Sequence, residues 1–141
     1  RELPVAWRRP DATQLEWARK ILAEARPQSD RADLPKIYAE RVMRLSEYPE
    51  TAQVPLQVLR IGNVTIGTMP CEVFCEIGLD FKRRSAVQPA FLVSLSHGYL
   101  GYLPTPRQHL LGGYETWLGT NRVEPSASEK MLDALIEMSR E

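Results

Sequence analysis

The hydrophobic spacing of this chain changes at Pro70, and that change is what most constrains the fold. Before Pro70, Val54–Ile61 and Val64–Met69 are apolar-rich runs of strand type, and Gly62-Asn63 between them is a two-residue turn signal. After it, Cys71–Phe81 places its apolar residues at the 3.6-residue period of a helix. Proline lacks the N–H that a strand ladder needs. The sequence therefore predicts a β-hairpin that ends at Pro70 and a helix directly after it.

A further strand is predicted over Ala90–Leu95, followed by the polar, aromatic loop Ser96–Tyr102. If this strand and the one ending at Met69 are parallel neighbours, Glu72 and the loop face the same crevice, because ligands of open α/β sheets collect beyond the strand carboxyl ends. Glu72 also has a plainer and more common interpretation, a first-turn glutamate that stabilises the positive end of a helix.

Four more helices are predicted from apolar periodicity and capping signals. Two precede the hairpin and two follow the aromatic loop: 11–26 closed by Pro27, 33–48, 105–111, and a last helix from Ser126. Asp11 with Gln14 and Ser126 with Glu129 have the spacing of capping boxes, while Asp33 and Thr105 are single-residue caps. The loop 28–32 is polar, and Tyr114–Asn121 has the composition of a functional loop.

Together these elements predict one α/β domain over 1–141, a mixed sheet with flanking helices. Its predicted core includes Leu56, Val58, Ile66, Phe74, Ile77, Phe91 and Val93. Cys71 and Cys75 fit neither a CxxC motif nor a zinc ribbon, so two small buried apolar groups are the favoured interpretation.

Composition excludes several classes of function. Acidic and basic residues number 18 each, so the formal net charge is zero and no global field attracts nucleic acid or an anionic membrane. The basic cluster Lys82–Arg84 suits the negative end of the predicted helix better than a nucleic-acid site. No apolar run reaches the roughly 18 residues of a membrane span. The chain begins at Arg1 rather than Met, which suggests a fragment.

Three segments, in order, resemble the neutral/alkaline (non-lysosomal) ceramidases and their bacterial relatives. Leu56–Glu72 is similar to the family's strand pair that ends in a Pro-Gly-Glu or Pro-Ala-Glu turn. Ser96–Thr105 is similar to the block Asn-x-Tyr-x-x-Tyr-x-x-Thr, and Gly113–Gly119 to a downstream Tyr-Glu-x-x-Ser-Thr segment. The three segments together cover less than half of the chain.

The resemblance implies a set of site residues. The family binds one zinc ion through two histidines, a glutamate and a tyrosine, and the last two match Glu72 and Tyr102. The family's asparagine is His97 here. The resemblance further implies a cleft lined by His97, Tyr99, Tyr114 and Glu115. The family's two histidine ligands and serine nucleophile have no counterpart in this sequence.

The resemblance thus implies the C-terminal part of a longer zinc-dependent hydrolase of N-acyl sphingosine-type amides. Its partners would be a lipid amide substrate and the missing N-terminal part of the same protein, and the family suggests a secreted or periplasmic location. Zinc is expected only when the upstream ligands are present, and the Glu72 carboxylate and the Tyr102 hydroxyl should come within reach of one ion. Two alternatives remain open, a non-catalytic relative that binds a small molecule or partner in the same cleft, and a structural domain.

Overall fold

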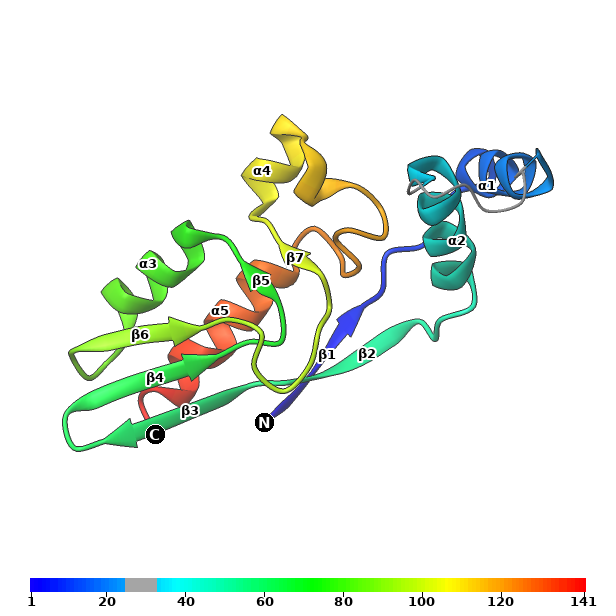
Figure 1. The fold of residues 1–141 in the computed structure, drawn as a ribbon. Coiled ribbons are helices and arrows are strands. Elements are labelled where there is room, and N and C mark those ends of the chain that lie inside the picture. The colour runs from blue at the N-terminus through cyan, green and yellow to red at the C-terminus, as the bar shows by residue number, and fades with distance from the viewer. Residues whose placement is uncertain (25–32) are drawn as a thin grey trace.

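The computed structural model describes residues 1–24 and 33–141 and has an α/β fold (Figure 1). The elements in chain order are β1 (Glu2–Ala6), α1 (Ala12–Glu24), α2 (Leu34–Ser46), β2 (Thr51–Pro55), β3 (Gln57–Ile61), β4 (Val64–Thr68), β5 (Glu72–Val73), α3 (Cys75–Arg84), β6 (Ala90–Val93), β7 (Tyr102–Leu103), α4 (Pro106–Leu111), the 3₁₀ turn Tyr114–Thr116 and α5 (Ala127–Met138). The strands form a three-stranded mixed sheet and two strand pairs.

The mixed sheet has the strand order β3-β4-β6. β3 and β4 are the predicted antiparallel hairpin, and Gly62 adopts φ +60° in its turn. β4 and β6 run parallel, with Thr65 opposite Ala90 and Thr68 opposite Val93. The prediction that these two strands are parallel neighbours is confirmed.

The run 54–61 forms two strands rather than one. β2 pairs antiparallel with β1, whereas β3 pairs with β4. Leu56 lies between them, and its backbone N–H and C=O both bond to Arg1, at 2.9 Å each. β1 thus pairs with the first two residues of the predicted strand, Val54 and Pro55.

Both α3 and α5 lie on one side of the mixed sheet (Figure 1). A Cβ atom on Gly67 of β4 would lie only 2.7 Å from the ring of Phe81, so the absence of a side chain lets α3 sit close to the sheet. Arg60 of β3 donates to the Ser139 carbonyl oxygen just after α5, at 3.0 Å. Helix packing is therefore confined to the face that carries Arg60 and Gly67.

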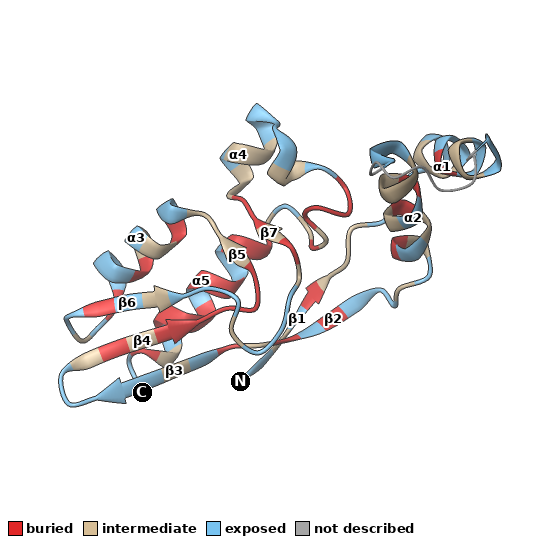
Figure 2. Cartoon of the chain, viewed as in Figure 1, coloured by how far each residue is buried: buried red, intermediate tan, exposed pale blue. Residues whose placement is uncertain are grey.

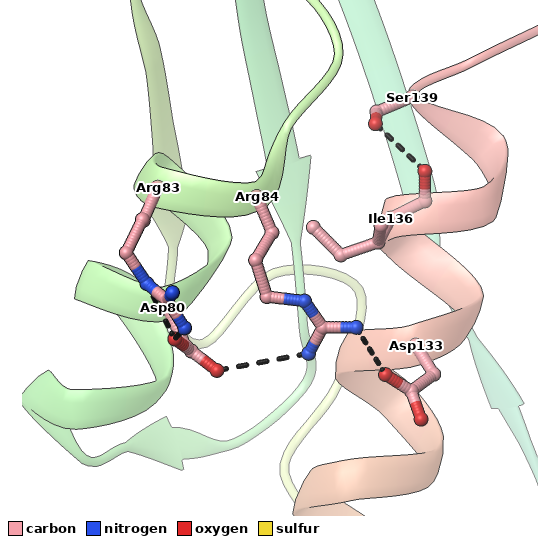
Figure 3. Close-up of polar contacts among 6 residues, drawn as sticks. All are labelled: Asp80, Arg83, Arg84, Asp133, Ile136 and Ser139. Atoms are coloured by element: carbon pink, nitrogen blue, oxygen red, sulfur yellow. Dashed lines mark hydrogen bonds and ion pairs between the residues drawn. The ribbon is translucent and has the colours of Figure 1, made fainter.

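Charged side chains join these two helices at the surface (Figure 3). Arg84 at the end of α3 donates to Asp133 of α5 at 2.7 Å and lies 3.6 Å from Asp80, one turn earlier in its own helix. The Lys82–Arg84 cluster ends the helix as predicted. Exposed pairs of this kind contribute about 0–1 kcal/mol each, so apolar packing must provide most of the contact energy between α3 and α5.

The predicted core is only partly correct. Leu56 and Ile77 are buried, and Val58 and Phe74 pack against the buried cluster from half-buried positions. Phe81, at the end of the same helical stripe, is fully buried.

Phe91 and Val93 were predicted to be core residues, and that prediction is wrong. They are 47% and 38% exposed, and Ile66 beside Phe91 is only half-buried (Figure 2). The cause is the one-sided helix packing, because successive strand residues point to opposite faces. Ala90 is buried on the helix side, whereas Phe91 lies on the other face.

A second, smaller buried cluster joins α1 and α2 to the rest of the molecule. Ala18 of α1 packs with Val42 and Leu45 of α2, and Leu118 from the loop before α5 completes the cluster. Trp7, which follows β1, meets Tyr48 edge to face with ring centroids 4.7 Å apart. α1 and α2 thus form a lobe with a small core of its own.

The first capping box is confirmed and the second is wrong. The Asp11 and Gln14 side chains each accept a hydrogen bond from the other's backbone N–H, at 2.8 and 3.0 Å. The Ser126 side chain makes no capping bond. Its hydroxyl donates to the carboxylate of Glu124 at 2.9 Å and accepts no bond from the backbone N–H of Glu129.

The single-residue caps are confirmed, with Asp33 accepting from the Lys36 N–H and Thr105 from the Gln108 N–H. The predicted helix end at Pro27 and the loop 28–32 lie outside the described residues. In the part of the chain that the structure describes, no helix has the length and apolar character needed to cross a membrane.

Candidate functional site

Glu72 and Tyr102 lie directly opposite each other in the parallel strand pair β5–β7. The Glu72 N–H donates to the Gly101 carbonyl oxygen at 3.0 Å, and the Phe74 N–H to that of Leu103 at 3.3 Å. The prediction that Glu72 occupies the first turn of a helix is wrong, because α3 begins only at Cys75. Pairing with a segment some 30 positions away outweighs the local helical signal at this point.

The two cysteines, which lie on either side of β5, differ in their exposure. Cys71, just before β5, is buried, and its burial raises the pKa of the thiol to about 12. Cys75 is exposed at the start of α3, and its thiol donates to Glu76 at 3.3 Å. The interpretation of two buried apolar groups therefore holds for Cys71 and is wrong for Cys75.

The Glu72 carboxylate accepts a hydrogen bond from one phenol and raises the pKa of two. The Tyr99 hydroxyl donates to its Oε1 atom at 2.8 Å. Partial burial, together with the hydrogen bond to Glu72 and its negative charge, raises the pKa of Tyr99. A hydrogen bond to Glu72 and its charge raise the pKa of Tyr102 as well. Both shifts favour the protonated form of the phenols.

A close backbone contact holds Tyr102 in place. Gly101 adopts φ +83°, and a Cβ atom there would lie 2.1 Å from the Thr120 carbonyl oxygen. The Tyr102 N–H donates to that same oxygen at 3.0 Å, and the buried Asn121 side chain donates to the Tyr102 carbonyl at 3.0 Å. Glycine at 101 is needed both for its backbone angle and for the space.

Four rings extend the site from Tyr102 towards α2. We call them the aromatic cluster, consisting of Tyr38, Tyr102, Tyr114 and Trp117. Neighbouring rings meet edge to face, with centroids 6.0 Å apart for Tyr102 and Tyr114, 5.6 Å for Tyr114 and Trp117, and 5.5 Å for Trp117 and Tyr38. Tyr114 and Trp117 are about half exposed. The cluster is an aromatic surface beside the Glu72 carboxylate.

Helix α2 contributes polar groups that sequence reasoning missed. Hydrogen bonding by Tyr38, followed by the hydrogen bond and charge of Arg41 and a hydrogen bond from Thr120, lowers the pKa of Tyr114. The Arg41 guanidinium also lies 5.0 Å from the centre of the Tyr38 ring. The composition of Tyr114–Asn121 and the resemblance of Gly113–Gly119 to a ceramidase segment pointed to the loop, but neither pointed to Tyr38 or Arg41.

The remaining predicted cleft residues lie apart from the Glu72 carboxylate. His97 adopts φ +64°, and its Nε2 atom is 2.9 Å from Oε1 of Gln57 in β3. Glu115 is half-buried in the 3₁₀ turn that carries Tyr114. Of the six predicted site residues, Glu72, Tyr99, Tyr102 and Tyr114 therefore form one connected group.

Among residues 1–24 and 33–141, no three His, Cys, Asp or Glu side chains converge in a way that could hold a metal ion. Glu72 and Tyr102 offer two oxygen donors, which fits part of a four-ligand zinc site. A cavity of about 270 Å³ lies elsewhere, between α3, the start of α4 and the start of α5, and includes Glu76, Asp80 and Glu129 in its lining.

Comparison with known proteins adds no relative, since no family model matches the chain and no curated protein matches it significantly.

Proposed function

We propose that this chain supplies two ligands, Glu72 and Tyr102, to the zinc site of a ceramidase-like amide hydrolase. The observation that carries the proposal is the register of β5 against β7, which sets the carboxylate-bearing residue opposite the phenol-bearing one. Two further ligands, the histidines that the resemblance implies, would come from outside residues 1–141.

Within this site the chain's own residues bind and orient. Tyr99 donates to one oxygen of Glu72 and so fixes the direction of the carboxylate. Tyr102 must lose its proton to become a strong ligand, which the charge of Glu72 opposes and a nearby cation favours. Zinc, when bound, would polarise the amide carbonyl and activate a water or nucleophile. The exposed rings of Tyr114 and Trp117 offer apolar surface beside the carboxylate for the chain of an N-acyl substrate.

The test is the zinc content of the longest natural form of the protein with Glu72→Ala or Tyr102→Phe. Each substitution removes one of four ligands, so we expect zinc occupancy and any amide hydrolysis to fall sharply. Glu115→Ala and Tyr114→Phe are the matched controls, because they alter the same residue types on the adjoining 3₁₀ turn, and both should keep the metal. Full zinc occupancy and full activity in both the Glu72→Ala and the Tyr102→Phe variants would contradict the proposal.

A second candidate, a non-catalytic binding domain, is favoured by one observation. Tyr99 bonds to the Glu72 carboxylate, and the half-exposed Tyr114 and Trp117 continue the aromatic surface from Tyr102, an arrangement that suits a small ligand with a cationic and an apolar part. If the ligand variants leave zinc content unchanged, this candidate takes the place of the hydrolase.

A further inference from the structure

The sheet β3-β4-β6 is covered by helices on one face only. Gly67 faces the ring of Phe81 in α3, and Arg60 reaches the residue after α5, so both mark the covered face. The residues that alternate with them lie on the other side. We call this other side the open sheet face, defined by Leu59, Ile61, Val64, Ile66, Phe91 and Val93.

The open sheet face is continuous across all three strands. Leu59, Ile66 and Phe91 are register partners in one row, and Ile61 pairs with Val64 in the next. The exposed fractions of the four most accessible side chains are large: Leu59 42%, Ile61 66%, Phe91 47% and Val93 38%. If each side chain exposes on the order of 200 Å² when free, these fractions amount to roughly 400 Å² of apolar surface.

The sheet combines an antiparallel pair, a type that can leave one face open, with a parallel pair, a type that is normally covered on both faces. The largest apolar patch of a typical monomer measures roughly 300–600 Å² and is often functional. The open sheet face is therefore a candidate interaction surface.

We propose that the open sheet face is the interface of a homodimer, in which two copies of the chain pack face to face about a two-fold axis. None of its six residues is charged, and the neighbouring positions at its end, Gln57 and Thr68, are neutral. The face can thus meet its own copy without placing like charges together. The zero net charge of the whole chain removes long-range repulsion between copies as well.

The area also suits a second copy. Two such faces would bury roughly 800 Å² of apolar surface, and the polar residues at the rim, such as Gln57 and His97, would bring the total above the roughly 1,000 Å² of a specific interface. Two twisted sheets stack about 10 Å apart with interdigitated side chains, which a row of Leu, Ile and Phe can supply.

The test measures mass in solution by sedimentation over a range of concentrations. The unmodified chain should reach twice its monomer mass of 16.1 kDa. Ile61→Lys or Phe91→Glu puts like charges from two copies into the interface, so each should weaken the dimer by at least about 100-fold. Both positions are exposed in the monomer, so circular dichroism should show an unchanged fold. Leu79→Lys, an exposed leucine on α3, is the matched control and should stay dimeric.

A second measurement needs no variant. Hydroxyl-radical footprinting of the unmodified chain should show Leu59 and Phe91 becoming protected as the concentration rises, while Leu79 stays reactive. A chain that remains monomeric into the millimolar range would overturn the proposal, whether or not another protein then binds this face. So would a dimer that persists in both the Ile61→Lys and the Phe91→Glu variants, or one that leaves Leu59 and Phe91 reactive.

Discussion

Glu72 controls the protonation of the two tyrosines beside it. Burial is the largest cause of the raised pKa of Tyr99, and the hydrogen bond to Glu72 and its negative charge add to it. For Tyr102, the hydrogen bond to Glu72 and its charge are the main causes of the raised pKa. Glu72→Gln removes the charge, and we expect both phenols to titrate at lower pH than in the unmodified protein. Alkaline absorbance titration measures this directly. Glu115→Gln is the control, and an equal shift there would contradict the assignment.

Gly101 is predicted to be intolerant of any side chain. Gly101→Ala combines φ +83° with a Cβ only 2.1 Å from the Thr120 carbonyl oxygen, so the free energy of unfolding should fall by more than about 2 kcal/mol. Gly62→Ala also has positive φ but nothing within 4 Å, and should cost about 1 kcal/mol. Urea unfolding of the two variants distinguishes the cost of the backbone angle from the cost of the close contact with Thr120. Equal losses of unfolding free energy in Gly101→Ala and Gly62→Ala would show that the close contact contributes nothing.

For single residues, the sequence predicted hydrogen bonds between near neighbours correctly in most cases. It failed where a residue's conformation depends on pairing with a distant segment. The Asp11 box and the Thr105 cap depend on neighbours three positions away, and both are present. Glu72 has a helical neighbourhood, yet its backbone pairs with Gly101 and Leu103 across the fold. That Glu72 and Tyr102 lie together followed from the parallel arrangement of the preceding strands, which the sequence could suggest without specifying the local register.

Among the elements, α3 depends on one large side chain. Phe81 is fully buried and packs against the bare backbone of Gly67. Phe81→Ala should therefore leave a cavity under the helix and lower the free energy of unfolding by about 3–5 kcal/mol. Leu79→Ala on the exposed side of the same helix should change it by less than about 0.5 kcal/mol. Denaturant midpoints compare the two, and a small effect at Phe81 would mean that the sheet collapses onto the helix.

Element types were easier to predict than element boundaries. The helices of the described chain and the hairpin follow their hydrophobic periods, but the run 54–61 is divided because β1 pairs with its first two residues. Pro55, the last residue of β2, lies directly before the division, and like Pro70 it lacks the N–H that a strand ladder needs. The division arises from two different partner strands, one of them some 50 positions away, and periodicity contains no information about partners.

For the whole molecule, the two buried clusters predict unequal stability. α5 and β4 belong to the main part of the fold, whereas α1 and α2 rest on a smaller cluster that includes Ala18, Val42 and Leu118. Native-state hydrogen exchange should therefore be faster in α1 and α2 than in α5. Uniform protection throughout the described residues would instead show that the lobe and the sheet open only together.

Periodicity could not predict which face of the mixed sheet the helices cover. Phe91 and Val93 have the composition of a buried strand, and Ile66 beside them does too, so a core assignment was the natural one. Which faces receive helices depends on how α3 and α5 cross the sheet, and both cross on the side of Gly67.

The register of β5 against β7 makes the length of the connecting chain more important than its composition. Deleting one residue between Gly98 and Gly101 would bring the buried Leu103, instead of Tyr102, opposite Glu72. An insertion next to Gly112, where the backbone is exposed, disturbs no such pairing. Related sequences should therefore keep the number of residues between Gly98 and Gly101, with Tyr99 retained for its bond to Glu72, and should gain or lose residues mainly around 112.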